Sequence, residues 1–191
     1  SLSHTDNGYE LIDNSNNLRL NLELDDYYKI ISENRSHPFN KIIKRDKSKI
    51  LDCTGGFARD ASILASLGHD VTLVENNPLI SKLLVDARER ILNKEIAEIF
   101  ARITIRLGNC IEYIRNSTDI FDYIYFDFMF NNTKSALPSK NEQFLRKIVS
   151  TNLEENLDII QETIQRVSGK VIIKEYINSN NYNNFEIINT Y

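Results

Sequence analysis

Short apolar runs alternate with stretches of helical periodicity throughout the part of the chain that follows Lys49. Short apolar runs are typical of buried strands, and apolar residues at three- and four-residue spacings are typical of amphipathic helices. The runs predict strands at 49–53, 70–75, 102–108, 122–127, 170–175 and 184–191. Strands that alternate with helices favour the α/β class, in which a mostly parallel sheet is covered by helices on both faces.

Helices are predicted between these strands at 58–68, 78–91, 110–117 and 153–167. Proline is favoured in the first turn of a helix, so Pro78 marks the start of the second one. Glycine commonly follows the last turn, so Gly68 and Gly169 are expected to end the first and the last helix.

The N-terminal part of the chain has a different pattern. Two stretches of alternating apolar and polar residues flank an Asn/Ser cluster within 9–24 and predict a β-hairpin. The polar and basic stretch at 25–48 predicts a helix that is interrupted near Pro38. We therefore divide the chain into an N-terminal hairpin with its connecting segment, 1–47, and a larger domain, 48–191.

Composition narrows the function classes only modestly. The chain has 191 residues, 41% of them hydrophobic, and a net charge of −4, which does not favour a polyanionic partner unless a local basic patch binds it. Cys53 and Cys110 lack the spacing of metal ligands, so no metal site is expected. The sequence shows neither a membrane-spanning run nor the layout of a signal peptide, and we expect a cytoplasmic protein with no membrane partner.

In parallel α/β sheets, ligands bind beyond the carboxyl ends of the strands. The first predicted strand ends at Asp52 and leads into a turn with Gly55 and Gly56. The glycine spacing of dinucleotide-binding proteins is missing, and the acid would repel a pyrophosphate but favour a cationic ligand such as S-adenosylmethionine. The other interpretation is that these glycines only shape the turn.

Two further strand ends carry polar residues. Glu75 ends the second strand, at a distance from the glycine turn that suits an acid binding ribose hydroxyls, although an acid at a strand end can also simply face water. Asn109 and Cys110 follow the third strand, where an adenine ring would lie. The Asn109 side chain can pair with adenine or cap the next helix, and the sequence favours neither.

The fourth strand ends at Asp127, which Phe130 follows three residues later. This arrangement resembles the loop of amino methyltransferases that act on nucleobases. An exocyclic amine is a poor nucleophile because its lone pair is delocalised into the ring, and acceptors for its hydrogens favour a reactive geometry. Asp127 is predicted to be such an acceptor, and Phe130 to stack on the extruded base.

The stretches at 51–84, 121–140 and 169–175, with "RDASILASLG" and "KSAL" as their most specific elements, resemble the RsmJ family of small-subunit rRNA guanine-N2 methyltransferases. The resemblance implies a class I, Rossmann-like methyltransferase fold that binds S-adenosylmethionine. It assigns cofactor contacts to Arg59, Asp60, Glu75, Asn76, Asn109, Cys110 and Asp127. The chain departs from the family pattern at Ala58, where the family has glycine, and at Phe128 and Asn131, where it has prolines.

The sequence therefore predicts an S-adenosylmethionine-dependent enzyme that methylates the N2 amine of a guanine in 16S rRNA, with the RNA or the small subunit as its partner. Substrate contacts are expected from the backbone carbonyl of Phe128 and from the cations Lys134, Lys140 and Lys174. Two alternatives remain open: a weakened relative that binds cofactor or ribosome without turnover, and a methyltransferase for a protein or small-molecule amine. The sequence does not indicate an oligomeric state.

Overall fold

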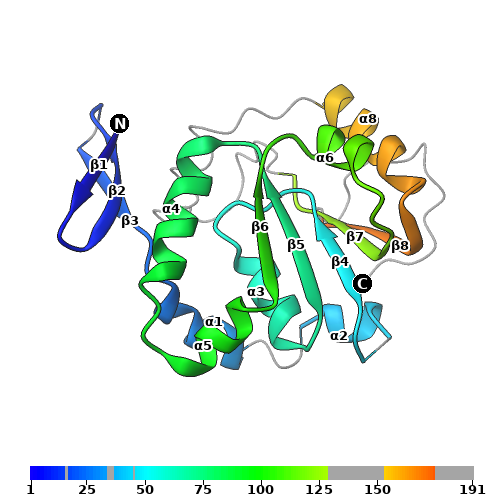
Figure 1. Cartoon of the computed structure of the whole chain (residues 1–191), viewed down its shortest axis with the longest axis horizontal. Coiled ribbons are helices and arrows are strands. Elements are labelled where there is room, and N and C mark those ends of the chain that lie inside the picture. The colour runs from blue at the N-terminus through cyan, green and yellow to red at the C-terminus, as the bar shows by residue number, and fades with distance from the viewer. Residues whose placement is uncertain (16, 34–36, 45, 129–152, 175–191) are drawn as a thin grey trace, which may run out of the picture.

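The computed structural model describes residues 1–15, 17–33, 37–44, 46–128 and 153–174 (Figure 1). In chain order its elements are β1 (Leu2–Thr5), β2 (Gly8–Asp13), β3 (Leu18–Asn21), the 3-10 helix η1 (Leu24–Asp26), α1 (Tyr27–Glu33), α2 (Phe39–Ile42), β4 (Lys49–Asp52), α3 (Arg59–Ser66), β5 (Asp70–Glu75), α4 (Pro78–Glu89), α5 (Lys94–Phe100), β6 (Ile103–Leu107), α6 (Cys110–Asn116), β7 (Phe121–Phe126), α8 (Leu153–Ile164) and β8 (Val167–Ile173). No helix within these ranges is both long and apolar enough to cross a bilayer.

The larger sheet has the strand order β6-β5-β4-β7-β8, and every described pair in it is parallel. The chain runs outward from β4 to β6 and then crosses back to β7, so the order reverses between β4 and β7. A crevice for ligands forms at such a reversal, beyond the carboxyl ends of the strands. The predicted α/β fold is confirmed.

Alternation along the strands divides the interior into two layers. Ile50 of β4 packs with residues of α3, α4 and α5, whereas its neighbour Leu51 packs with residues of α6 and α8. Successive side chains of a strand point to opposite faces, so a strand buried on both faces needs an unbroken apolar run. This explains why helices cover the sheet on both sides (Figure 1).

The predicted hairpin is present as β2 and β3, and β1 adds a third antiparallel strand that the sequence pattern had not indicated. This sheet lies beside α4 (Figure 1). Arg90, just after α4, holds it there through an ion pair with Glu23 at 2.7 Å, and Asp86 of α4 accepts a 3.1 Å hydrogen bond from the amide of Tyr9 in β2. The predicted interruption at Pro38 is also confirmed, because α1 and α2 lie on either side of it.

Two helix predictions need correction. The last helix ends at Ile164, and Gly169 lies inside β8, where it does not end a helix. A Cβ atom at Gly169 would lie 2.3 Å from the backbone oxygen of Asp122, so close strand contact explains the glycine. The helix α5 was not predicted, although Asn93 caps it and Ile96, Ile99 and Phe100 give it helical spacing. The predicted strand at 184–191 lies outside the described residues.

Candidate functional site at the carboxyl ends of the strands

The structure brings several of the predicted residues together at the carboxyl ends of the strands of the parallel sheet. Asp52 and Glu75 are the last residues of β4 and β5, and Asp127 and Lys174 directly follow β7 and β8. The backbone of Lys174 continues the pairing of β8 with β7, because its amide donates a 2.8 Å hydrogen bond to the carbonyl oxygen of Phe126. Residues far apart in sequence therefore meet where the strand order reverses.

The glycine turn after β4 packs tightly on β5. The amide of Gly55 donates to the carbonyl of Val74 at 3.1 Å, and a Cβ atom at Gly55 would lie 2.4 Å from Cδ2 of Leu73. Gly56 has a φ of 50°, in the left-handed region. Both glycines are required by the turn, which brings its backbone close to the end of β5.

Asp52 lies below this turn and is only 2% exposed. Its Oδ1 accepts a 3.0 Å hydrogen bond from the amide of Thr54. Burial raises the pKa of Asp52 to about 7 despite the hydrogen bonds from Thr54, and the negative charges of Asp60 and Asp127 add to the rise. Asp52 is thus an acid that a nearby cation would help to ionise.

Glu75 is also buried, and both of its oxygens accept backbone hydrogen bonds. Oε2 accepts from Gly56 at 2.7 Å and Oε1 from Asn77 at 2.6 Å. Burial raises the pKa of Glu75 despite these donors. Each carboxylate oxygen has a second lone pair, so ribose hydroxyls can still bind there.

Four residues form what we call the Lys174 cluster: Asp60, Tyr125, Asp127 and Lys174. Nζ of Lys174 lies 2.9 Å from Oδ2 of Asp60 and 2.7 Å from Oδ2 of Asp127. The Tyr125 hydroxyl donates to the same Asp60 oxygen at 2.6 Å. The cluster therefore contains two carboxylates, one ammonium group and one neutral donor.

The two carboxyl groups of the cluster respond differently to this setting. Burial alone would raise the pKa of Asp60, but the Lys174 ammonium and the Tyr125 hydroxyl hold it below its usual value. Burial and the charge of Asp60 raise the pKa of Asp127 despite Lys174. The pKa of Lys174 is raised because the attraction of both carboxylates exceeds its desolvation. Of these two carboxylates, Asp127 is thus the better proton acceptor at neutral pH.

The backbone around Asp127 is fixed from both sides. Its amide donates a 2.7 Å hydrogen bond to Oγ1 of Thr54 in the glycine turn. The ring of Phe128 stacks on Phe126, with centroids 5.1 Å apart and planes 16° apart, and is buried in the layer under α6 and α8. The side chain of Phe128 therefore packs into the core, and its backbone remains as the group that can contact a substrate.

At the end of β6, Asn109 caps α6. Its Oδ1 accepts hydrogen bonds from the amides of Ile111 at 2.8 Å and Glu112 at 3.4 Å. This is the capping role that the sequence left open, and it leaves the side-chain amide nitrogen as the donor for an adenine ring. Cys110 is buried at the first position of α6.

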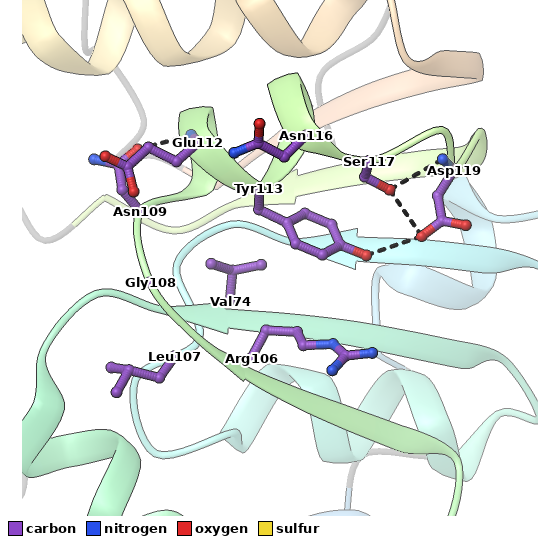
Figure 2. A pocket seen from close by; sticks show the side chains of 10 residues that line it. All are labelled: Val74, Arg106, Leu107, Gly108, Asn109, Glu112, Tyr113, Asn116, Ser117 and Asp119. Carbon is purple, nitrogen blue, oxygen red and sulfur yellow. Dashed lines mark hydrogen bonds between the residues drawn. The ribbon is translucent and has the colours of Figure 1, made fainter.

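A pocket of about 470 Å³ opens beside Asn109, between β6 and α6 (Figure 2). Tyr113 lies along it, and its hydroxyl donates to Asp119 at 3.0 Å, while Arg106 lines the β6 side. The carboxylates Asp52, Glu75 and Asp127 do not line this pocket. It therefore extends from the Asn109 end of the site and is separate from the Lys174 cluster.

Some predicted residues lie apart from the others. Arg59 is exposed at the start of α3, whereas Asp60 beside it joins the Lys174 cluster. Phe130, Lys134, Lys140 and Asn131 lie outside the described residues. Tyr125 and Thr54 were not predicted from the sequence as site residues. A tyrosine two positions before Asp127 in an otherwise apolar strand was the available signal for the first.

Comparison with known proteins places this geometry in context. Residues 28–184 match the profile of a family described as "Putative SAM-dependent methyltransferase". Over 131 residues the chain is 37% identical to ribosomal RNA small subunit methyltransferase J of Ectopseudomonas mendocina, covering 67% of this chain and 50% of that protein. Its namesake in Legionella pneumophila (strain Lens) is 33% identical over 129 residues, 66% of this chain and 52% of that protein. The chain thus spans about half the length of these relatives.

Solved structures share the fold at low sequence identity. A SAM-dependent methyltransferase from Neisseria gonorrhoeae superimposes with a TM-score of 0.69 and 21% identity, covering 90% of this chain and 69% of that one. The glycopeptide N-methyltransferase MtfA complexed with S-adenosylmethionine gives a TM-score of 0.51 and 13% identity, covering 75% of this chain and 53% of that one. These two similarities concern the fold alone.

Proposed function

Because this chain belongs to the SAM-dependent methyltransferase family, we propose that it transfers a methyl group from S-adenosylmethionine to the N2 amine of a guanine in 16S rRNA. The names of its relatives, which are ribosomal RNA small subunit methyltransferases, support the substrate class. The observation that carries the proposal is the position of Asp127, a half-exposed carboxylate beside the glycine turn at the carboxyl end of β7.

The residues present fit the cofactor. The tight turn at Gly55 and Gly56 lets the backbone approach a ligand closely, and the buried carboxyl of Asp52 favours a cationic amine over a phosphate. Glu75 would accept the ribose hydroxyls, with Asn76 beside it. The Asn109 amide and the backbone of Cys110 would contact adenine, and Arg59 and Asp60 would lie near the methionine end. The bound cofactor supplies an electrophilic methyl group on a sulfonium.

The chain itself would position the amine. Asp127 would accept one hydrogen of N2, and the carbonyl of Phe128 would accept the other, so that the nitrogen lone pair points at the methyl group. Methyl transfer leaves a proton on the nitrogen, and the raised pKa of Asp127 suits it to receive that proton. We assign Phe130 to stacking on the base, although it lies outside the described residues.

RNA binding would rest on local cations, since the net charge of the chain is −4. We assign backbone contacts to Lys134 and Lys140, two lysines outside the described residues. The described carboxylates of the site would repel phosphates. The RNA backbone would therefore contact those two lysines, and only a single base would enter the crevice. A ribosomal substrate would place the reaction in the cytoplasm.

The test begins with cofactor binding. Calorimetric titration of the purified protein with S-adenosylmethionine should show binding. If no heat of binding is measured at any of several temperatures, the proposal is contradicted. Tritiated methyl groups should then enter rRNA from a strain that lacks the gene. Asp127→Ala should abolish this incorporation, whereas Asp158→Ala, at an exposed position of α8, should not. Mass spectrometry of the labelled rRNA identifies the base, and label that resists nuclease would indicate a protein substrate instead.

A further inference from the structure

We propose that Asp127 and Lys174 together read the Watson–Crick edge of the target guanine, an inference that rests on the function proposed above. The two oxygens of Asp127 are acceptors, and Nζ of Lys174 is a donor 2.7 Å from Oδ2. The pair therefore offers acceptor, acceptor and donor in a row, which is the pattern that cytosine presents to guanine.

Guanine has the complementary row of N2–H, N1–H and O6. Neighbouring polar atoms on this edge share a carbon atom, as the two oxygens of a carboxylate do, so the spacings correspond. One oxygen of Asp127 would accept from N2 and the other from N1, while Lys174 donates to O6. A carboxylate oxygen has two lone pairs, so Oδ2 can bind Lys174 and N1–H together.

Lys174 has the remaining donor that this role requires. An ammonium group has three N–H donors, and two of them bind Asp60 at 2.9 Å and Asp127 at 2.7 Å. The Lys174 side chain is 52% exposed and that of Asp127 is 35% exposed, so a base can reach both. No other described residue accepts a hydrogen bond from Nζ of Lys174, so the third N–H is available to a ligand in the crevice.

Asp60 and Tyr125 act as positioning residues for this donor. The side chain of Asp60 is 14% exposed, and the Tyr125 hydroxyl fixes its Oδ2 at 2.6 Å. A lysine side chain alone has many rotamers, and two carboxylates on different elements restrict its ammonium to one place. Lys174, which the sequence predicted as a substrate contact, is therefore assigned to a hydrogen bond with the guanine base.

Other bases match this row less well. Adenine matches only two of the groups, through N6–H and N1, and leaves one carboxylate oxygen without a donor. In 2,6-diaminopurine the N2 amine is kept, but an acceptor at N1 faces a carboxylate oxygen and an amine replaces O6 opposite Lys174. Each such mismatch sets a donor against a donor or an acceptor against an acceptor, which weakens binding of the wrong base.

The test measures binding of single-stranded RNA pentamers to protein saturated with S-adenosylhomocysteine. The pentamers are uridines with guanine, adenine or 2,6-diaminopurine at the centre, and fluorescence anisotropy gives each Kd. The wild type should prefer guanine at least tenfold over both other bases. Lys174→Met should reduce the preference for guanine over 2,6-diaminopurine at least threefold, because the group that reads O6 is lost while the mismatch between N1 and Asp127 remains.

The matched control is Lys170→Met, which makes the same substitution at an exposed lysine of β8, the strand that Lys174 follows. This variant should keep the full preference for guanine. The inference is overturned if the wild type binds the three pentamers equally, or if Lys174→Met lowers all affinities and keeps their ratio, as a phosphate-binding lysine would. Methyl transfer to rRNA is measured separately, so either result can occur while the proposed function stands.

Discussion

The hydroxyl of Tyr125 donates a 2.6 Å hydrogen bond to Oδ2 of Asp60, a residue 65 positions earlier in the chain. The bond joins β7 to the first turn of α3, below the crevice. Tyr125 is 1% exposed, so water cannot replace its hydroxyl. The site is therefore stabilised by a polar contact that crosses the core.

Tyr125→Phe removes only this hydroxyl. A hydrogen bond to a charged group contributes about 1.5–3 kcal/mol, and we expect the free energy of unfolding to fall by that amount. Urea denaturation measures it. Tyr123→Phe is the matched control, on the same face of the same strand, because its hydroxyl has no hydrogen bond to the described residues; it should cost less than about 0.5 kcal/mol. Equal losses in the two variants would contradict the assigned bond.

Asp52 should make stability depend on pH. Its pKa rises from 3.8 to about 7 on folding, so between these values the folded protein binds more protons than the unfolded chain. The contribution of Asp52 is fully present below pH 4 and is lost as the pH rises to 7. Since one pKa unit corresponds to about 1.4 kcal/mol, the loss is on the order of 4 kcal/mol.

Asp52→Asn should remove this contribution, so the difference in unfolding free energy between wild type and variant should change across pH 4–7. Chemical denaturation at several pH values measures it. The exposed Asp6 provides the control, and Asp6→Asn should follow the wild type. Parallel curves for wild type and Asp52→Asn would show that Asp52 does not titrate in this range.

Ala58 has a φ of 61°, where an alanine is strained by about 1 kcal/mol. Ala58→Gly relieves that strain but removes a fully buried methyl group worth roughly 0.8 kcal/mol, so stability should change little. Ala61→Gly, equally buried inside α3, loses its methyl group and adds the helical cost of glycine, about 1 kcal/mol. Thermal denaturation should therefore rank Ala61→Gly well below Ala58→Gly, and the reverse order would contradict the strain.

Phe128 stands where the RsmJ family has proline, yet its ring is stacked on Phe126 in the core. Removing a buried phenylalanine ring costs about 3–5 kcal/mol, and proline replaces only part of its volume. We expect Phe128→Pro to lower the free energy of unfolding by about 2 kcal/mol or more, and Phe128→Leu by about 1 kcal/mol. Urea denaturation of both variants measures this, and a Phe128→Pro protein as stable as the wild type would show that the ring contributes little.

The sequence was enough to predict which residues lie at the carboxyl ends of the strands. It was not enough to predict which of these residues contact one another. Asp52, Glu75 and Asp127 end apolar runs, and a strand buried on both faces leaves only its end for a carboxylate. Lys174 and Asp60 were assigned to different ligands, whereas the structure pairs them, because no local pattern links such distant positions. Gly169 was misread for a similar reason, since its requirement comes from the neighbouring strand and not from a helix end.

The ion pair of Lys174 and Asp60 also bears on the order of folding. It joins positions 114 residues apart, and contacts of such long range form slowly because a long loop must close first. Before β8 docks, no other lysine among the described residues pairs with Asp60 and Asp127, so their carboxylates repel each other. Docking of β8, one of the last described elements to leave the ribosome, removes this repulsion. The crevice thus acquires its final charge balance only when nearly all of the described chain has been synthesised.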